Sequence, residues 1–179
     1  MFSVKKTKIE GCYLLDPPVH EDQRGLFVKS FHKSSLTNLG LVSDFKEDFY
    51  SISEKNVIRG LHLAKSPSDH EKTVTCLSGE VLDLVLDLRV GSPTFGKCES
   101  FLLSSLNKRI IYIGKGIAHG FLSKTDHTII YYKVSSEYNA SDDIGVRWDS
   151  IDFEWPISNP VLSERDSEFP TLEEFISKI

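Results

Sequence analysis

The sequence predicts an all-β fold, a sandwich or barrel with short helices at its ends. Two observations support this prediction. Short apolar runs alternate with glycine- and proline-containing turns along the chain of 179 residues. Leucines also occupy every second position from Leu82 to Leu88, and this strict period of two favours a strand over a helix. Many short strands between turn residues are typical of all-β sandwiches and barrels.

In chain order, the apolar runs predict strands whose ends are marked by turn residues. The run at 11–15 is closed by Asp16-Pro17-Pro18, and a turn at 22–25 leads into the next run. The Ser78-Gly79-Glu80 sequence predicts a hairpin turn between two further runs. The strands expected from these runs cover residues 2–9, 11–15, 26–31, 48–53, 57–63, 71–77, 80–88, 97–103, 109–113, 118–122 and 128–134.

Two short helices complete the expected fold. Residues 33–41 could form a helix with Ser34 or Ser35 as its N-cap and Gly40 at its C-terminal end. No repeat or linker divides the sequence, so the whole chain of 179 residues is expected to form one domain. After Pro170, the apolar residues that fit one face of a closing helix are Leu172, Phe175, Ile176 and Ile179.

The composition argues against several classes of protein. A net charge of -5 and a pI near 5.7 argue against a nucleic-acid-binding surface, which needs a basic stripe. The N-terminus lacks the apolar run of a signal peptide, and no stretch is as long as a transmembrane helix, so no membrane partner is expected. The three cysteines, Cys12, Cys76 and Cys98, form no cluster and suggest a reducing compartment. We therefore expect a cytoplasmic protein.

The segment Val57-Ile58-Arg59-Gly60-Leu61-His62 is the most informative stretch for function. A glycine inside a strand marks a bulge or a close approach to the backbone. Simple pleat alternation would send Arg59 and His62 to opposite faces of the strand. If both serve one site, Gly60 must break the alternation, and we expect that it does. The alternative is a plain strand in which His62 forms a local hydrogen bond.

The open mouth of a small β-barrel is a common place for a small ligand. A histidine beside an acid can act as a general base, and a tyrosine can deliver a proton from the other side. A lysine can stabilise an enolate, and arginines fit phosphate oxygens. Each candidate also has an ordinary structural alternative, such as a solvated strand lysine or a core histidine. The candidates are Arg24, Arg59, His62, Lys72, His119, Tyr132, Tyr138, Arg165 and Asp166.

A metal site is not expected. Single-domain β-barrels often hold iron or zinc through a His-x-His pair with further carboxylate and histidine ligands. Here His62 is followed by Leu63 and Ala64, and the sequence contains no His-x-His. A bound metal is therefore not predicted.

The motifs of the chain resemble the dTDP-4-dehydrorhamnose 3,5-epimerase family, nucleotide-sugar epimerases of the cupin jelly-roll superfamily. The matching segments follow the family order over nearly the whole chain. They are Asp22-Gln23-Arg24-Gly25-Leu26-Phe27, Val57-Ile58-Arg59-Gly60-Leu61-His62, Gly79-Glu80-Val81-Leu82-Asp83, Asp87-Leu88-Arg89-Val90-Gly91-Ser92-Pro93-Thr94-Phe95-Gly96, Gly116-Ile117-Ala118-His119-Gly120-Phe121, Tyr132-Lys133, Trp155-Pro156 and Leu162-Ser163-Glu164-Arg165-Asp166.

The resemblance implies a cupin-type jelly roll that acts as a homodimer without metal or cofactor. Its substrate would be a nucleotide-diphosphate-linked 4-keto-6-deoxyhexose, inverted at carbon 3, carbon 5 or both through an enolate, in deoxysugar biosynthesis for cell-surface polysaccharides. His62 matches the family's base and Asp166 the acid that pairs with it. Tyr132 matches the proton donor on the opposite face of the sugar, and Lys72 the lysine near the keto oxygen.

The resemblance also implies a set of substrate-binding residues. In the family, part of the nucleotide pocket is completed by the partner subunit, near residues 24–27. The positions that match the family's substrate pocket are Arg24, Phe27, Lys29, Glu47, Arg59, His119, Tyr138 and Arg165.

Several pocket positions depart from the family pattern. Lys29 stands where the family usually has glutamate, and Glu47 and Phe49 stand where it usually has Gln-x-Asn. A thymine N–H needs an acceptor that Lys29 cannot supply, whereas Glu47 could accept from the amine of cytosine or guanine. We therefore expect a nucleobase other than thymine, with CDP the first alternative and GDP the second. Two other functions stay open, a 3,4-ketoisomerase and a non-catalytic nucleotide-sugar binder.

Overall fold

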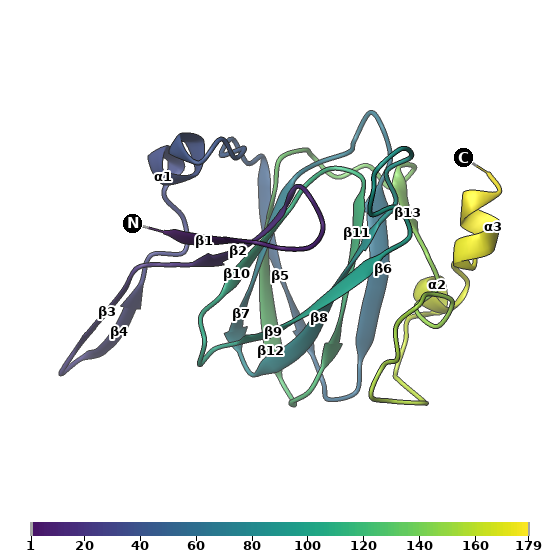
Figure 1. The fold of residues 1–179 in the computed structure, drawn as a ribbon. Coiled ribbons are helices and arrows are strands. Elements are labelled where there is room, and N and C mark those ends of the chain that lie inside the picture. Colours follow the sequence, from purple (N-terminus) through teal and green to yellow (C-terminus); the bar gives the residue numbers. More distant parts are fainter. Residues whose placement is uncertain (1, 179) are drawn as a thin grey trace.

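Two antiparallel β-sheets pack face to face in the computed structural model, which describes residues 2–178 (Figure 1). The all-β prediction is therefore confirmed. In spatial order, the six-stranded sheet contains β1 (Ser3–Lys6), β2 (Cys12–Asp16), β10 (Ile110–Ile113), β7 (Lys72–Ser78), β12 (Thr128–Val134) and β5 (Glu47–Ser53). The five-stranded sheet contains β13 (Asp143–Gly145), β6 (Ile58–Ala64), β11 (Ile117–Ser123), β8 (Glu80–Asp87) and β9 (Cys98–Ser104).

The alternation in β8 separates two apolar cores. Val81 and Val85 belong to the core between the two sheets. Leu84 and Leu86 point to the other face of β8, where the C-terminal part of the chain covers the five-stranded sheet with side chains such as Trp155. Both faces of this strand are therefore buried, including the two acids Asp83 and Asp87 on the valine face.

A third apolar cluster holds the N-terminal helix α1 (Lys33–Asn38), whose Leu36 is buried beside Leu15 and Tyr112. The predicted helix and its Gly40 terminus are confirmed, because Gly40 adopts a φ of +73° just beyond the last turn. The predicted serine N-cap is wrong. The cap residue is His32, which makes no capping hydrogen bond through its side chain.

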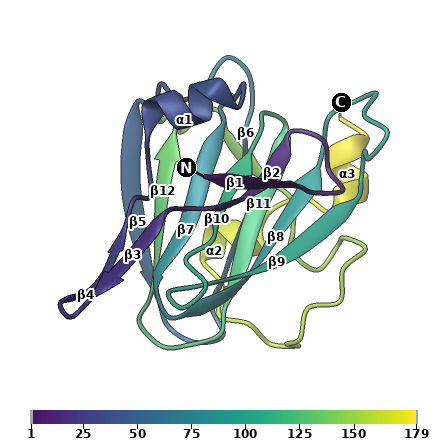
Figure 2. The ribbon, with the colours of Figure 1, turned by 60° about the vertical axis from the view of Figure 1, so that its left-hand side comes forward.

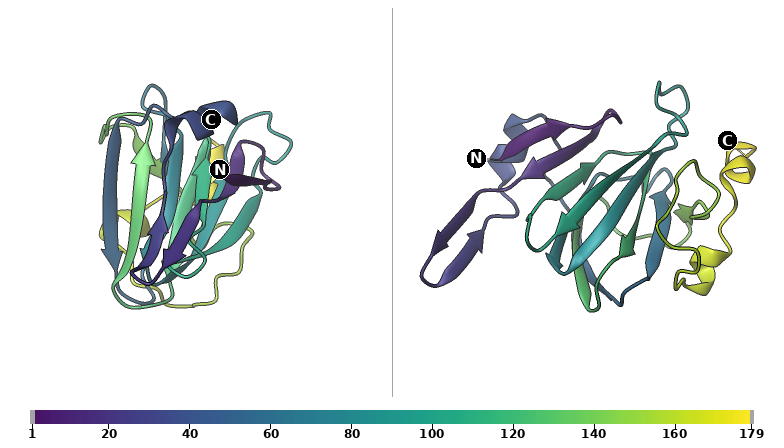
Figure 3. Two further views of the ribbon diagram at one scale, coloured as in Figure 1. Left: turned by 90° about the vertical axis from the view of Figure 1, so that its left-hand side faces the viewer. Right: turned by 60° about the horizontal axis from the view of Figure 1, so that its bottom comes forward.

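The strands β3 (Val19–Asp22) and β4 (Gly25–Val28) form a separate two-stranded hairpin. Figure 2 and Figure 3 show this hairpin extending away from the two large sheets. The turn predicted at 22–25 joins the two strands, with Gly25 at a φ of +112°. The hairpin's apolar residues Leu26 and Phe27 are exposed in the single chain.

The expected hairpin turn at 78–80 is wrong. The strand β7 lies between β10 and β12 in one sheet, whereas β8 lies between β11 and β9 in the other. Gly79, with a φ of +79°, carries the chain from one sheet to the other. A tight turn between two strands does not by itself specify that they pair, because each strand can find a better partner elsewhere.

The C-terminal part adds two short helices, α2 (Glu164–Ser167) and α3 (Leu172–Ile176). The predicted closing helix corresponds to α3, and its Phe175 is buried while Leu172 packs against the same core. Ile176 departs from the predicted face, because 38% of it is exposed. Ile179 lies outside the described residues. No helix within residues 2–178 is long and apolar enough to cross a membrane.

Candidate active site

A cavity of about 500 Å³ opens between the two sheets. Its wall on the five-stranded sheet includes His62 from β6 and His119 from β11, whose Cα atoms pair directly. Its wall on the six-stranded sheet includes Lys72 from β7 and Tyr132 from β12. The four side chains therefore meet from four strands of two different sheets. The described residues contain no group of three or more histidine, cysteine, aspartate or glutamate side chains arranged to hold a metal ion.

A β-bulge at Gly60 brings Arg59 and His62 to the same pocket. Ile58 and Leu61, three residues apart, both point into the core under the C-terminal part of the chain. Arg59 and His62, also three residues apart, both line the cavity. Gly60 has a φ of +113°, and a Cβ there would lie 2.6 Å from the His119 carbonyl oxygen. The prediction that Gly60 breaks the pleat alternation is confirmed.

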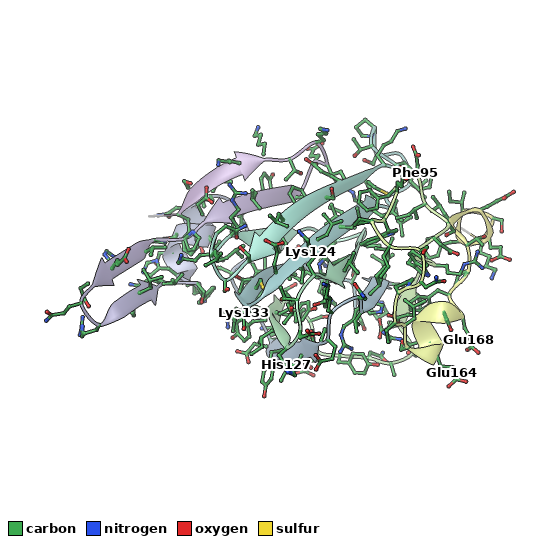
Figure 4. All side chains as sticks on the ribbon, turned by 90° about the horizontal axis from the view of Figure 1, so that it is seen from below. Phe95, Lys124, His127, Lys133, Glu164 and Glu168 are labelled. Atoms are coloured by element: carbon green, nitrogen blue, oxygen red, sulfur yellow. The ribbon has the colours of Figure 1, made fainter. Side chains whose placement is uncertain are left out.

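His62 pairs with Asp166, which lies 104 positions later in the chain. His62 Nε2 lies 2.9 Å from Asp166 Oδ1, and the Gly60 N–H donates to Asp166 Oδ2 at 2.8 Å. This long-range pair replaces the local hydrogen bond that was the alternative for His62. Glu164 and Glu168 of the α2 region point away from the sheets in Figure 4, whereas Asp166 is only 2% exposed.

Asp166 is held as a carboxylate and fixes which nitrogen of His62 is free. Burial favours the neutral acid, but hydrogen bonds from His62 and Gly60 and the charge of Arg165 lower the pKa of Asp166 to about 2. A carboxylate can only accept, so a hydrogen bond from His62 to Asp166 places the proton on Nε2, and the donor-only Arg165 Nη2, 2.8 Å from that nitrogen, then makes a contact and not a hydrogen bond. Nδ1 is then the nitrogen that can take a proton from a ligand.

Arg165 lies on the same side of the cavity as His62. Its Nη2 is 2.8 Å from His62 Nε2, and its guanidinium also contacts Asp143 and Asp166. The ring of Phe169 packs under the Arg165 guanidinium at 5.5 Å and against the edge of His62 at 5.7 Å. Arg165 is therefore part of the charged network that surrounds the His62–Asp166 pair.

A second histidine–aspartate pair lies deeper in the same wall. His119 Nε2 is 2.7 Å from Asp83 Oδ2, and both side chains are buried. Burial raises the pKa of Asp83, while His119 and Lys72 oppose that rise. Asp83 Oδ1 is buried without a hydrogen-bond partner among residues 2–178. His119 therefore has a buried hydrogen-bond partner and also lines the cavity. The two interpretations, a core histidine and a substrate-binding histidine, do not exclude each other.

Lys72 and Tyr132 form the opposite wall. They lie on neighbouring strands, and the Cα of Lys72 pairs with that of Val134, two residues from Tyr132. Burial lowers the pKa of Lys72 to about 8, although Asp143 and Asp83 favour its charged form. Burial raises the pKa of the Tyr132 phenol well above its usual value. Tyr132 is therefore a neutral proton carrier, and Lys72 is a cation whose charge is easily lost.

Three further predicted residues line the cavity. Arg59 donates from Nε to Ser53 Oγ at 3.0 Å and from Nη2 to the Ile52 carbonyl at 3.1 Å. Glu47 accepts the backbone N–H of Tyr138 at 2.8 Å, and the Tyr138 ring is largely exposed at the rim. The exposed Tyr138 ring marks the mouth of the cavity, where a bound molecule could extend outward.

Arg24, Phe27 and Lys29 do not reach the cavity of their own chain. Arg24 stands on the turn of the projecting hairpin and pairs with Asp22 at 2.6 Å. Phe27 is 60% exposed on β4, and Lys29 is exposed just after that strand. The structure therefore separates these three predicted residues from the other nine.

Sequence reasoning missed His70, which lines the cavity, and Asp83, which holds His119 from behind the cavity wall. Asp83 gave a signal, because it is an acid between Val81 and Val85 on an apolar strand face, and a buried acid needs a partner. His70 lines the cavity and lies 2.9 Å from Ser136 Oγ through Nδ1. Burial and the nearby Lys72 lower the pKa of His70 to about 4. No local pattern around His70 marked it.

Comparison with known proteins finds full-length similarity to one family. A family model described as dTDP-4-dehydrorhamnose 3,5-epimerase matches residues 6–174. The chain is 40% identical over 167 residues to the dTDP-4-dehydrorhamnose 3,5-epimerase of Shigella flexneri, covering 92% of each chain. It is 34% identical to a dTDP-4-dehydrorhamnose 3-epimerase of Streptomyces niveus, covering 93% of this chain and 82% of that one.

Solved structures agree with the sequence comparison. The crystal structure of dTDP-4-dehydrorhamnose 3,5-epimerase from Bacillus anthracis, with TDP and PPi bound, superposes with a TM-score of 0.93. That protein is 38% identical and the match covers 96% of this chain and 100% of that chain. The similarity confirms the predicted cupin-type jelly roll.

Proposed function

The chain belongs to the dTDP-4-dehydrorhamnose 3,5-epimerase family, and from that membership we propose how its cavity carries out the reaction. The chain is an isomerase of deoxysugar biosynthesis. It inverts carbon 3, carbon 5 or both of a nucleotide-linked 4-keto-6-deoxyhexose by proton abstraction and return. The relatives are named as epimerases, so a ketoisomerase and a non-catalytic binder are not favoured.

His62 is proposed as the base and Tyr132 as the proton donor. A carbon beside a ketone is acidic because the electron pair left behind delocalises onto the carbonyl oxygen. His62 Nδ1 would take that proton, and Asp166 would stabilise the imidazolium that forms. The Lys72 ammonium would stabilise the enolate oxygen. Tyr132 would then give its phenolic proton to the other face of the carbon.

The observation that supports this proposal is that the base and the proton donor come from different sheets. His62 comes from the five-stranded sheet and Tyr132 from the six-stranded sheet, and both line the same cavity. A sugar bound between the sheets would present one face to each residue. Inversion needs this arrangement, because a proton returned to the face from which it left restores the original centre.

We propose that Arg59 and Arg165 contribute to holding the diphosphate, since both guanidinium groups reach the cavity. The cavity of one chain offers little support for a nucleobase other than thymine. Lys29, one support for a base other than thymine, does not line the cavity of its own chain, and Glu47 already accepts the Tyr138 N–H. The relatives are named for dTDP-linked sugars, so dTDP is the first nucleotide to test, with CDP and GDP beside it.

A homodimer is proposed because the site of one chain is incomplete. Arg24, Phe27 and Lys29 match the family's substrate pocket, yet they stand on a hairpin that projects away from their own cavity. A second copy could bring its hairpin to the cavity of the first. The exposed apolar side chains Leu26 and Phe27 suit a surface that is buried in a pair.

Two further expectations stay proposals. The C-terminal part packs on the five-stranded sheet, and the core between them contains side chains of that sheet and of the C-terminal part. This shared core supports a single domain. The three cysteines are free thiols, which supports action in the reducing cytoplasm.

The test is deuterium exchange in heavy water with 4-keto-6-deoxyhexoses linked to dTDP, CDP and GDP. We expect exchange at the carbons beside the ketone, with inversion of at least one of them. His62→Ala should lower the exchange rate by about 10²- to 10⁴-fold while nucleotide binding, measured by calorimetry, is retained. The matched control is His127→Ala, which removes an exposed histidine outside the cavity. Normal exchange by His62→Ala would remove His62 from the mechanism.

A further inference from the structure

Strand β5 brings an aromatic side chain against the proposed proton donor. Phe49 lines the cavity, and its Cα pairs directly with that of Tyr132 on β12. The two rings are stacked, with centroids 4.8 Å apart and planes inclined by 20°. Phe49 occupies one of the positions where the sequence departs from the usual family pattern. The contact is therefore a property of this chain's own sequence.

Tyr132 is held on two sides by aromatic groups. The Phe49 ring covers one side, and the His119 ring meets it edge-on with centroids 6.2 Å apart and planes inclined by 72°. Offset stacking and edge-to-face contact are the two arrangements that aromatic pairs favour. Because the ring is packed on two sides, it cannot swing about its Cα–Cβ bond without losing these contacts, and they therefore constrain where its hydroxyl points. His119 is in turn fixed by Asp83.

Phe49 cannot take part in proton transfer itself, because its side chain has no titratable atom. It is 47% exposed, so it is not a core residue whose main contribution is burial. Its aromatic contact among the described residues is the ring of Tyr132. These features separate a role in orienting Tyr132 from a general role in packing.

We propose that Phe49 is a positioning residue for the proton-return step, holding the Tyr132 phenol toward the sugar face opposite His62. The inference rests on the proposed function, in which Tyr132 is the donor. In that step the O–H bond of Tyr132 breaks and a C–H bond forms at the enolate carbon. The enolate electron pair becomes the new C–H bond and the carbonyl re-forms. The tyrosinate then regains a proton from water, and the protonated His62 releases its proton to water, so that both groups return to their starting states.

The orientation of Tyr132 decides between two fates of the enolate. When the phenol is in place, the carbon is protonated from the Tyr132 wall and the centre inverts. When the phenol turns away, the protonated His62 returns a proton or deuteron to the original face. That second path gives exchange without inversion. Loss of a positioning residue should therefore change the number of inversions per exchange event, whereas loss of general packing should lower both together.

The experiment measures exchange and inversion separately in heavy water, with the variants Phe49→Leu, Phe49→Met and Phe49→Tyr. Leucine and methionine keep an apolar side chain but remove the flat ring, and tyrosine keeps the ring. We expect Phe49→Leu and Phe49→Met to lower inversions per exchange event by about ten- to a hundredfold, because a misplacement of about 1 Å can cost about 10²-fold. Phe49→Tyr should keep the wild-type ratio. Using two variants protects the test if one of them folds poorly.

The matched control is Phe95→Leu, which makes the same change in the loop between β8 and β9, outside the cavity (Figure 4). It should leave the ratio unchanged. A wild-type ratio in both Phe49→Leu and Phe49→Met would overturn the inference. Tyr132→Phe, measured in parallel, tests the donor role of Tyr132 separately from the positioning role of Phe49. If Tyr132→Phe still inverts normally, the donor assignment itself is wrong; if it uncouples exchange from inversion while the Phe49 variants do not, only the role of Phe49 is lost.

Discussion

Lys72 illustrates how one buried residue can set a pH limit for the reaction. Its ammonium lies in the cavity wall, where burial disfavours the charged form and lowers its pKa to about 8. Asp143, which lines the cavity from β13 of the other sheet, favours the charged form. A neutral lysine cannot stabilise an enolate oxygen by charge. The residue is therefore most useful at neutral pH and below.

We expect the exchange rate at saturating substrate to fall as the pH rises through about 8, because Lys72 loses its proton there. Asp143→Asn should move this fall to lower pH, since it removes a charge that raises the pKa of Lys72. The measurement is the rate of deuterium exchange between pH 6 and about 10, where free lysine would still be charged. A rate that stays constant to pH 10 in the wild type would contradict the role given to Lys72.

The orientation of Arg59 and His62 depends on a single residue, Gly60. Gly60 occupies a backbone conformation with positive φ, and the His119 carbonyl lies where its Cβ would be. Any other residue would have to displace the neighbouring strand. The bulge therefore depends on glycine, and the orientation of both functional side chains depends on the bulge.

At the scale of elements, the loop from Arg89 to Gly96 is organised by one carboxylate. Asp87 accepts from Arg89 through Nε at 2.8 Å and Nη2 at 2.7 Å. It also accepts from the hydroxyls of Ser92 and Thr94, each at 2.6 Å. Burial alone would raise the pKa of Asp87, but these hydrogen bonds hold that pKa well below its usual range. The loop that joins β8 to β9 is thus fixed by charge as well as by turn residues.

Asp87→Asn should lower the free energy of unfolding at pH 7 by about 1–3 kcal/mol, because it leaves Arg89 without its carboxylate partner. The sign with pH follows from the lowered pKa. The contribution of Asp87 to stability is complete above its pKa in the unfolded chain, about 4, and is lost as the pH falls through its lower pKa in the folded protein. The difference between wild type and variant should therefore shrink in acid. Denaturant unfolding at pH 7 and pH 3 measures this difference in the free energy of unfolding. The control is Asp152→Asn, which changes an exposed acid.

At the scale of the whole molecule, the projecting hairpin β3–β4 needs an explanation. A two-stranded hairpin is marginally stable by itself, and this one exposes Leu26 and Phe27. A second copy would cover those side chains and would complete the cavity with residues that the family uses for the nucleotide. The shape of the single chain therefore agrees with the proposed homodimer.

Phe27→Glu should weaken the dimer, because it places a charge in the surface that the second copy would bury. We expect sedimentation at micromolar protein to give a dimer for the wild type and monomer for the variant. Nucleotide affinity should fall in parallel if the hairpin of one copy completes the cavity of the other. Val90→Glu, at an exposed apolar position on the β8–β9 loop, is the control and should stay dimeric. A monomeric wild type would contradict the proposal.

The sequence by itself determined where most strands run and which face of each is buried. The even positions of β12 correspond to its buried face, because period-two burial is a local property of a strand, whereas the alternation in β8 identified the strand but both of its faces are buried. The break at Gly60 was also readable, since only an interrupted pleat could bring Arg59 and His62 to one side. The family motifs added the expected roles of these residues.

The tertiary structure alone decided which strands became neighbours and which residues meet. The turn at 78–80 joins two sheets instead of one hairpin, and Asp166 reaches His62 across 104 positions. The projecting hairpin takes Lys29 away from the cavity that its motif predicts. The reason is that local patterns specify the conformation and the buried face of a segment, whereas its partner depends on how all segments together bury their apolar faces and satisfy their polar groups.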